Sequence, residues 1–530
     1  MAGEADGRSG DDAVQFVVIY GNGHHQAGGP RPWAVLEKDG WDDRGYRTLF
    51  NLWIVDSEGN RHDIGAVKIG EFGMDEREHG GTVLPDRFTA LSDNFFSVGQ
   101  DDTYYERLRQ LGDDIRLSVL GGLRDMAYDE HILEAARGEE VTRTSLWRFL
   151  KPAVVEEQFR RIARGGDRVA PFHVVYRAPA PAAGGGGLEL GFDVVPGTKP
   201  SSNIHVLTGR NGAGKSVLLN RLARAVADPA ADREAVGSII ENDRGQRRSF
   251  ANLVSVSFSA FDDLPSLPED DESFPATHVG LRVPSSGTRA PRMKSQWQLK
   301  RDFADSVEAC LTGEQGYRWL NALRTLTYAG SGLLEEGWLE DFQTTASPSR
   351  RRAKARKLFA GLSAGHKVVL LSVTRLVEHV GERTLVIIDE PETHLHPPLL
   401  SAFIRVLSDL LTDRNGLAII ATHSPVVLQE VPADCVWKLR RYGDLMAADR
   451  PGIETFGENV GVLTREVFGL EVTASGFHRE LSSLVDCGES YESIQDRFHH
   501  RLGAEARIIT RSLIALRDHG DAAWAPEGMS

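Results

Sequence analysis

Residues 209–216 constrain this chain more than any other segment. They read Gly-Arg-Asn-Gly-Ala-Gly-Lys-Ser and match the phosphate-binding loop (P-loop) pattern Gly-x-x-x-x-Gly-Lys-Ser/Thr at every defined position. At ordinary residue frequencies this pattern arises by chance in roughly one chain of this length in fifty. Apolar residues before the loop predict a strand, and apolar residues at helical spacing after it predict a helix.

The glycines of this loop can bring backbone N–H groups close to phosphate oxygens, because a side chain would block that approach. Lys215 places a positive charge beside the β- and γ-phosphates, which also makes it a candidate catalytic residue, and the Ser216 hydroxyl is a candidate ligand for Mg²⁺. We expect the loop to hold ATP through Gly209, Arg210, Asn211, Gly212, Ala213, Gly214, Lys215 and Ser216.

A second segment, residues 385–390, ends in two carboxylates. Its first four residues form an unbroken apolar run, as in a parallel strand covered on both faces. Asp389 and Glu390 follow at the C-terminal end, where open α/β sheets bind their ligands. Adjacent side chains on a strand point in different directions, so we assign Asp389 to Mg²⁺ and Glu390 to the attacking water as general base. An exposed acidic strand end is the alternative.

Two further segments can face a nucleotide. Ser363 and Gly365 open an apolar helical stretch and leave backbone N–H groups and the positive end of the helix dipole facing outward, as in an anion site. An ordinary Ser N-cap is the alternative. His423 follows the apolar strand Leu417–Ala421, where a polar side chain can reach a γ-phosphate or the attacking water; a structural histidine is the alternative.

Taken together and in this order, the four segments resemble the ABC-type ATPase head, in the branch that contains RecF, SMC-like proteins and the overcoming-lysogenization-defect ATPases. Residues 385–397 are similar to the Walker B segment and D-loop of that branch. Residues 362–366 are similar to its signature Leu-Ser-x-Gly-Gln, with His366 in place of Gln, and residues 422–425 to its switch-histidine segment. The resemblance covers about residues 188–440, and its motifs are specific for the ATPase but not for its task.

The resemblance implies a P-loop NTPase of α/β class with a parallel core sheet, an antiparallel β subdomain and an inserted helical lobe. It also implies a head-to-tail homodimer, in which ATP on the P-loop of one copy is capped by Ser363 and Gly365 of the other, and in which His423 is the switch histidine. The Q-loop departs from the family pattern, because the segment where its glutamine is expected contains none. The candidate replacements are Ser257, Ser259 and Asp262.

A narrower resemblance is to the ATPases of bacterial anti-phage systems of the Septu and retron-associated kind. It rests on residues 256–262, on Phe468-Gly469-Leu470 and on the lack of long coiled-coil arms. Members of that group are thought to work beside a separate nuclease or other effector chain, so the resemblance implies such a partner.

The bulk properties are those of a globular protein. The 530 residues have room for about three domains, and no apolar run approaches the ~18 residues of a membrane span, so we expect no integral membrane segment. The three cysteines match no metal or disulfide spacing, and the N-terminus does not read as a signal peptide, so we expect a cytoplasmic protein. A net charge of −15 disfavours indiscriminate nucleic-acid binding but leaves room for local basic patches.

Residue patterns divide the chain into three parts. Residues 1–177 begin with an expected antiparallel β-meander over 14–73 and continue with helices, either as a separate region or as part of the ATPase head. Residues 188–440 form the expected ATPase core with a helical insertion at about 265–350. Residues 451–530 read as a C-terminal helical region.

Two basic clusters lie in the stretch between the P-loop and the signature segment. One surrounds Trp297, and the other lies just before the signature segment; their members are Arg289, Arg292, Lys294, Lys300, Arg301, Arg350, Arg351, Arg352, Lys354, Arg356 and Lys357. Cations beside an aromatic side chain can track a nucleic-acid backbone. A solvated helix face is the alternative.

These observations favour an Mg²⁺-dependent ATPase that acts as a motor or sensor on nucleic acid, in phage defence with a separate effector. The alternative is a nucleotide-gated regulatory scaffold that holds an effector protein without direct contact with nucleic acid. A transporter ATPase that docks on separate membrane proteins is a third reading.

Overall fold

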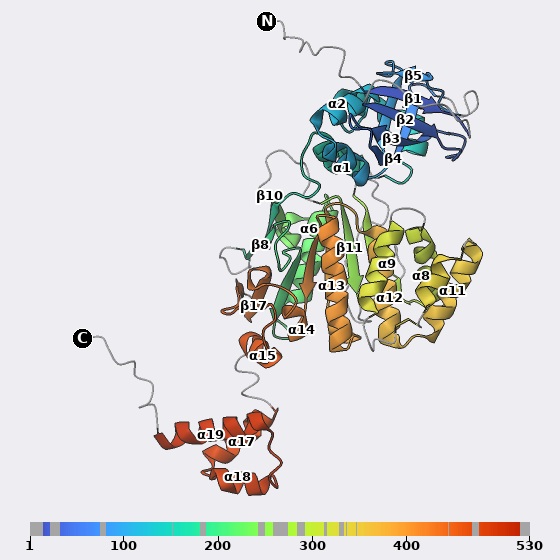
Figure 1. Cartoon of the computed structure of the whole chain (residues 1–530). Helices are drawn as coiled ribbons and strands as arrows, with labels where there is room; N and C mark the ends of the chain where they lie inside the picture. Colours follow the sequence, from blue (N-terminus) through green and yellow to red (C-terminus); the bar gives the residue numbers. More distant parts are fainter. Residues whose placement is uncertain are drawn as a thin grey trace, which may run out of the picture. The chain divides into compact units, whose positions relative to one another are not determined.

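The chain divides into two compact units, Met1–Ala170 and Pro171–Ser530 (Figure 1). A computed structural model describes residues 14–21, 32–74, 81–150, 152–180, 187–241, 250–257, 274–283, 292–311, 315–327, 333–334, 337–345, 347–443, 445–468 and 476–519.

The larger unit is built on a seven-stranded sheet with the order β12-β11-β15-β16-β9-β17-β18. Its strands are β9 (Ile204–Gly209), β11 (Asn252–Ser257), β12 (Ala276–Gly280), β15 (Thr384–Asp389), β16 (Leu417–Ala421), β17 (Val436–Tyr442) and β18 (Leu445–Asp449). Every pair of neighbours is parallel except β17 and β18. Strands β9, β11 and β16 are buried along their whole length, and β16 is accordingly apolar without alternation, whereas β9 and β11 also carry buried polar residues. The expected α/β fold with a parallel core sheet is confirmed.

Both faces of this sheet are covered. On one face, α6 (Lys215–Ala227) and a three-stranded antiparallel sheet, β10-β7-β8, share a core with strand residues such as Leu385 and Ile387. On the other face, α12 (Ala364–His379) and α13 (Pro397–Asp413) pack against residues such as Val386 and Ile388. The small sheet consists of β7 (Phe172–Arg177), β8 (Glu189–Val194) and β10 (Ser238–Glu241). It places residues 172–177 in this unit, whereas we expected the N-terminal part to extend to residue 177.

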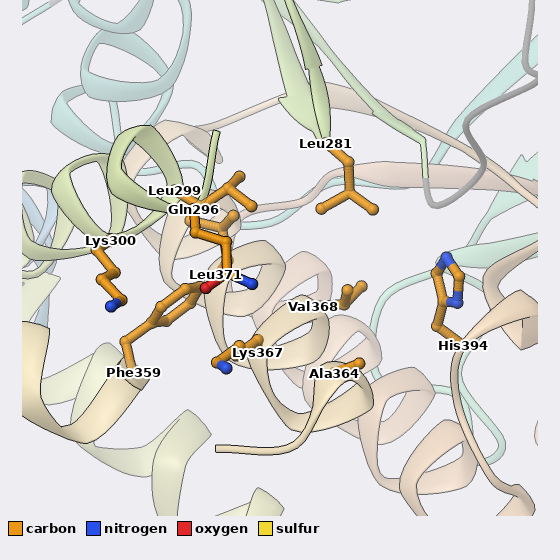
Figure 2. Close-up of a pocket in the computed structure, with 10 residues that line it drawn as sticks. All are labelled: Leu281, Gln296, Leu299, Lys300, Phe359, Ala364, Lys367, Val368, Leu371 and His394. Atoms are coloured by element: carbon orange, nitrogen blue, oxygen red, sulfur yellow. The ribbon is translucent and has the colours of Figure 1, made fainter. Parts of the chain in front are cut away.

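A helical lobe follows β12 along the chain and consists of α8 (Gln296–Leu311), α9 (Gln315–Leu326), α10 (Trp338–Gln343) and α11 (Pro348–Gly361). Helices α8 and α11 pack antiparallel, because Glu308 near the end of α8 pairs with Arg351 near the start of α11, and Phe303 stacks on Phe359 with ring centroids 5.1 Å apart. A cavity of about 250 Å³ lies between these helices and the start of α12 (Figure 2). The described helices of the lobe start at Gln296 and not near residue 265, because residues 276–280 form the edge strand β12.

The chain after β18 is mainly helical in its described part, with α15 (Val460–Phe468), α17 (Gly476–Asp486), α18 (Tyr491–Arg497) and α19 (Ala504–His519). Leu481, Val485 and Ile494 form the small core of the last three helices. No helix in the described ranges is long and apolar enough to cross a membrane.

The smaller unit holds a six-stranded sheet with the order β5-β1-β2-β3-β4-β6. The strands are β1 (Gln15–Ile19), β2 (Trp33–Lys38), β3 (Leu49–Val55), β4 (Arg61–Glu71), β5 (Arg87–Phe88) and β6 (Phe95–Gly99). Strands β2, β3 and β4 pair antiparallel as expected, but β1 pairs parallel with β2, so the expected meander is wrong at its first strand. The connection from Ile19 to Trp33 is long enough for a crossover, which a parallel pair needs.

Helices cover one face of this sheet and share a large core with Phe16, Phe50 and Phe96. The helical segments are α1 (Asp102–Gln110), α2 (Asp113–Gly122), α3 (Glu130–Ala136), η1 (Thr142–Leu146), α4 (Pro152–Val154), η2 (Val155–Phe159) and α5 (Arg160–Ala163). The smaller unit therefore has a hydrophobic core of its own.

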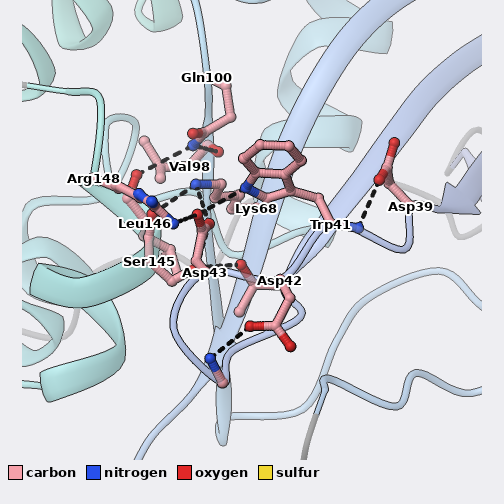
Figure 3. Close-up of polar contacts among 12 residues, drawn as sticks. Asp39, Trp41, Asp42, Asp43, Lys68, Val98, Gln100, Ser145, Leu146 and Arg148 are labelled. Carbon is pink, nitrogen blue, oxygen red and sulfur yellow. Dashed lines mark hydrogen bonds and ion pairs between the residues drawn. The ribbon is translucent and has the colours of Figure 1, made fainter. Parts of the chain in front are cut away.

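A buried ion network joins β4, the loop after β2 and the end of η1 (Figure 3). The Asp43 carboxylate lies 2.7 Å from Lys68 Nζ and 2.7 Å from the Arg148 guanidinium, and it accepts hydrogen bonds from Trp41 Nε1 and Ser145 Oγ. Only 1% of the Asp43 side chain and 3% of the Lys68 side chain are exposed. Burial opposes ionisation of Asp43, yet its donors, Lys68 first among them, hold the pKa of Asp43 below its ordinary value. The network therefore compensates for the burial of the Asp43 carboxylate.

We predict that Lys68→Met lowers the free energy of unfolding of the smaller unit by about 3–5 kcal/mol, because Asp43 would keep its burial and lose one of its two cations. Urea unfolding of the full chain at pH 7, followed by circular dichroism, measures this loss.

Arg47→Ala is the matched control. Arg47 pairs with Asp42 at 3.1 Å in the same loop, but the two side chains are 57% and 42% exposed. We expect a much smaller loss for this exposed pair, because water screens its charges. Equal losses in the two variants would contradict the assignment of stability to the buried network.

Candidate nucleotide site

The P-loop joins the C-terminal end of β9 to the start of α6. Gly209, Gly212 and Gly214 have φ angles of +150°, +78° and +91°, a region that residues with a side chain rarely adopt. At Gly209 an added Cβ would also lie 2.4 Å from the Leu439 carbonyl oxygen, whereas at Gly212 it would meet nothing within 4 Å. The loop therefore needs glycine for its backbone conformation and, at residue 209, for close packing on β17 as well.

Lys215 lies beneath this loop. Its Nζ donates to the carbonyl oxygens of Gly209 at 3.1 Å and Arg210 at 3.3 Å, and the residue is 5% exposed. Burial lowers the pKa of Lys215, and the negative charges of Glu390 and Asp389 oppose that shift. The lysine thus lies within electrostatic reach of the carboxylates that follow β15. Among the other predicted phosphate-binding residues, Ala213 is buried and Gly214 half-buried, whereas Arg210, Asn211, Gly212 and Ser216 are exposed.

One strand separates the P-loop strand from the carboxylate strand. Strand β16 pairs in parallel with both β9 and β15, and its register aligns Leu207, Ala421 and Asp389 across the three strands. Neighbouring strands are about 4.8 Å apart, so the ends of β9 and β15 are about 10 Å apart. Residues 422–424 continue β16 into the space between them.

The two carboxylates at the end of β15 leave the strand in different directions. Alternation along β15 places Asp389 on the same face as Leu385 and Ile387, which is the face covered by α6. Glu390 ends the alternation, because its φ of 44° and ψ of 61° are left-handed and uncommon for a residue with a side chain. Its backbone N still donates to the Ala421 carbonyl at 2.9 Å. The expected divergence of the two side chains therefore comes from a turned backbone as well as from strand alternation.

His423 lies between two glutamates. Its Nδ1 is 3.5 Å from Glu390 Oε1 and 3.5 Å from Glu392 Oε1, and the side chains of His423 and Glu390 are 41% and 34% exposed. The structure thus brings together Glu390 and His423, which the sequence suggested separately.

Glu392 is a residue of this site that sequence reasoning missed. Both of its carboxylate oxygens lie 2.8 Å from the Thr422 hydroxyl, and one accepts a hydrogen bond from the His423 backbone N at 2.9 Å. Only 14% of its side chain is exposed. Glu392 therefore holds the backbone of the histidine segment from a position two residues after Glu390. The available signal was a second acidic residue in the Pro-Glu-Thr-His segment, 391–394.

The signature segment begins α12. Ser363 is the N-cap, and its hydroxyl accepts a hydrogen bond from the His366 backbone N at 3.3 Å. Gly365 packs so closely on the D-loop that an added Cβ would lie 2.7 Å from the His394 carbonyl oxygen. In the described part of one chain, the contacts of Ser363 and Gly365 are thus with α12 itself and with the D-loop, not with the P-loop.

Ser257 ends β11 in register with Asp389 on the neighbouring strand. It is 4% exposed and stands where a residue can approach the Asp389 side of the site. The other candidate replacements for the Q-loop glutamine, Ser259 and Asp262, lie outside the described residues, as do Arg289, Gly469 and Leu470.

Comparison with known proteins gives a family match in this region. The family model described as "AAA domain, putative AbiEii toxin, Type IV TA system" matches residues 339–429, which include the signature, Walker B, D-loop and histidine segments. This match supports a P-loop ATPase domain.

Similar solved structures are parts of ABC transporters. One is a metal-chelate type ABC transporter in an inward-facing conformation, with 16% identity over 56% of this chain and 89% of that chain and a TM-score of 0.28. Another is an ATP-binding cassette of an ABC transporter in its ADP conformation, with 14% identity over 58% of this chain and 100% of that chain and a TM-score of 0.30.

A curated relative matches the chain almost from end to end. It is the protein ea59 of Escherichia phage lambda, which is 38% identical in a match that covers 96% of this chain and 99% of the relative. At this identity and coverage, the chain belongs to the family of protein ea59.

Proposed function

We propose that this chain is an Mg²⁺-dependent ATPase of the ABC type that works as a head-to-tail dimer. The observation that carries the proposal is the convergence of Lys215, Glu390 and His423 at one edge of one parallel sheet. Lys215 lies in the loop after β9, His423 follows the adjacent strand β16, and Glu390 follows the next strand, β15.

The P-loop supplies the phosphate site. Its backbone N–H groups and the positive end of the α6 dipole attract the triphosphate. Lys215 has its ammonium group on the loop carbonyls, and in the proposed complex it would contact the β- and γ-phosphate oxygens. Because Lys215 is buried and hydrogen-bonded to the loop, its side chain loses little conformational freedom when it binds these phosphates.

The magnesium ligands that the chain offers are Ser216 and Asp389. Ser216 is exposed at the start of α6, and Asp389 lies on the α6 face of the sheet, so both fit a divalent cation that is bound jointly with phosphate oxygens. Mg²⁺ would neutralise negative charge on the β- and γ-phosphates. The described residues contain no cluster of three or more His, Cys, Asp or Glu side chains for a metal held by protein alone, which agrees with a site that needs the nucleotide.

Glu390 and His423 act on the water and on the γ-phosphate. Glu390 is partly exposed and turned away from the strand, so its carboxylate can accept a proton from the attacking water. His423 is held in place from its backbone by Glu392 and can donate a hydrogen bond to the γ-phosphate. Glu392 is therefore a positioning residue, whereas Glu390 and His423 are the groups that meet the reactants.

A second copy completes the site. Ser363 and Ala364 are exposed at the start of the 16-residue helix α12, so the positive end of that helix is open to an anion. In a head-to-tail dimer, Ser363 and Gly365 of each copy would cap the γ-phosphate on the P-loop of the other.

The ATPase would act as a motor or sensor on nucleic acid, beside a separate nuclease or other effector. Exposed cations and the exposed Trp297 on the helical lobe support the nucleic-acid role. The family description names a toxin of a type IV TA system and the curated relative is a phage protein, which supports a role in the conflict between phage and host. A closer link to Septu- or retron-associated systems stays a prediction.

We predict that Glu390→Gln lowers the turnover number for ATP about 10²- to 10⁴-fold, because the general base is lost while the shape of the side chain is kept. ATP binding and ATP-dependent dimers should persist. Lys215→Ala should instead weaken ATP binding about 10- to 100-fold, because a charged hydrogen-bond donor is lost. Phosphate release, nucleotide titration and size-exclusion chromatography with ATP measure the three quantities. Full activity of Glu390→Gln would refute the assignment of the base.

Glu392→Gln should lower the turnover number about 10-fold and leave KM for ATP unchanged, because one acceptor for the histidine segment becomes a donor. The control is Glu458→Gln, a half-buried glutamate away from the P-loop whose carboxylate accepts from the Asn459 backbone N. A change in KM alone, or equal effects of the two variants, would contradict the positioning role.

The head-to-tail arrangement predicts complementation. Lys215→Ala and Ser363→Arg should each be inactive alone, because each dimer then carries two damaged composite sites. In an equimolar mixture, half of the dimers pair the two variants and hold one intact site, so the rate should recover to about a quarter of the wild-type rate. A mixture as inactive as its components would show that Ser363 does not serve the P-loop of a second copy.

A further inference from the structure

The cavity in the helical lobe is lined by residues that the proposed ATP site does not use. It has a volume of about 250 Å³, and its wall is formed by apolar side chains from three helices, Leu299 of α8, Phe359 of α11 and Val368 of α12. Figure 2 shows Lys300, Phe359 and Lys367 on one side of this space and His394 on the other. The polar side chains at the cavity are thus few and mostly basic or neutral.

The cations of this region fall into two groups. Arg351, Arg352 and Lys354 on α11 each lie beside an acidic side chain, that of Glu308, Asp305 or Asp341. By contrast, Lys300 and Lys367 line the cavity, and no acidic side chain in the described ranges lies within ion-pair distance of either. These three cations of α11 therefore have acidic partners, as do Lys294 and Arg301 of the first basic cluster. The lysines at the cavity have none in the described part of the chain, so both ammonium groups are available to an anion from outside the chain.

An exposed aromatic side chain follows a cavity-lining residue in α8. Trp297 follows the lining residue Gln296 in α8 and is 66% exposed, and the Arg301 guanidinium lies over its ring at 5.7 Å from the centroid. A large exposed indole beside a cation is a surface on which a nucleic-acid base stacks.

We propose that this cavity takes one unpaired base of single-stranded nucleic acid, with Lys300 and Lys367 on the flanking phosphates and the neighbouring base on Trp297. This inference rests on the proposed nucleic-acid function and names its binding site and its substrate class. The volume is below the range of about 300–1,000 Å³ that holds drug-sized ligands, so it suits one ring system. The Gln296 amide offers a donor and an acceptor to a base edge. A duplex keeps its bases stacked and cannot place one there without unpairing.

The occupant would touch two segments of the proposed ATP site. Ala364, which lines the cavity, immediately follows the signature Ser363, and His394, which also lines it, is the D-loop residue that packs on Gly365. A base in the cavity would therefore contact the segments that carry Glu390 and the capping serine, so single strands should change the rate of ATP hydrolysis.

The test compares a fluorescein-labelled dT 12-mer with a 12-bp duplex by fluorescence anisotropy, using the full chain and a series of salt concentrations. We expect at least tenfold tighter binding of the single strand. The double variant Lys300→Glu and Lys367→Glu should bind the single strand at least tenfold more weakly. For this variant, the slope of log binding constant against log salt concentration should be less steep by about 1.4, since each lost phosphate contact on a single strand reduces the slope by about 0.7.

Gln296→Trp fills the cavity from an exposed position and should weaken the preference for single strands while leaving the salt slope unchanged. A 12-mer of abasic sites should bind the wild-type chain more weakly than dT binds Gln296→Trp, because it also lacks the base that stacks on Trp297. The matched control is the double variant Arg501→Glu and Arg507→Glu, which makes the same charge change on exposed residues near the C-terminus and should bind as the wild type does.

The outcomes separate the inference from the proposed function. If the wild type binds single strands and the cavity variants bind them equally well, the cavity assignment is overturned and the nucleic-acid role stands. If the wild type binds neither probe, the nucleic-acid role fails as well, while ATP hydrolysis that depends on Lys215 and Glu390 would still support the ATPase. If laurate binds the wild type and not Gln296→Trp, and dT binds neither, the cavity holds an aliphatic carboxylate and the inference is wrong.

Discussion

The register of β16 between β9 and β15 is the constraint on which the candidate site depends. A slip of one residue would turn every side chain of β16 to the opposite face and move His423 away from Glu390. Buried polar side chains fix this register at the other end of the strands, where Asn203 accepts through its backbone carbonyl from the Ala418 N at 2.8 Å and donates through its side chain to the Gly416 carbonyl at 2.7 Å. Because Asn203 is 3% exposed, a slipped register would leave its amide without partners in the core.

The short segment after β15 connects three parts of the proposed machinery. Glu390 turns out of the strand in a left-handed conformation, Glu392 holds the histidine segment, and His394 packs on Gly365 at the start of α12. A backbone this constrained has little freedom to move at one point alone. In a head-to-tail dimer, the start of α12 of each copy would face the nucleotide of the other copy. A movement of Glu390 in one site would therefore also move Ser363 and Gly365 of the same copy, which cap the nucleotide in the second site. The close contact at Gly365 gives a packing reason for glycine in addition to the expected approach to phosphate.

The sequence predicted the parts of the site that are contiguous in the chain. The P-loop, the apolar strand before Asp389 and the capped start of α12 each lie within a few residues, so local patterns suffice. Glu392 was not predicted because its partners, Thr422 and His423, lie about thirty residues away just after β16, and only the pairing of β15 with β16 brings them together. The parallel pairing of β1 with β2 was not predicted either, because a strand with one buried face shows the same alternation of apolar residues in a parallel and in an antiparallel pair. Likewise, the sequence shows a run of cations at 350–357 but not that Arg351 is neutralised by Glu308.

Ion pairing separates the structural cations of this chain from those left for a ligand. Lys68 is buried, forms an ion pair with Asp43 and donates a hydrogen bond to the Ser145 carbonyl oxygen, so its ammonium group has its partners inside the fold. With 76 acidic and 61 basic residues in the chain, an acidic neighbour is the common condition for a cation here. Lys300 and Lys367, which line the apolar cavity, lack the attraction of an acidic neighbour in the described part of the chain, an attraction worth up to about 1 kcal/mol for an exposed ion pair. Packing does not require a charge at either position, and this agrees with the proposed contact of both lysines with an anion from outside the chain.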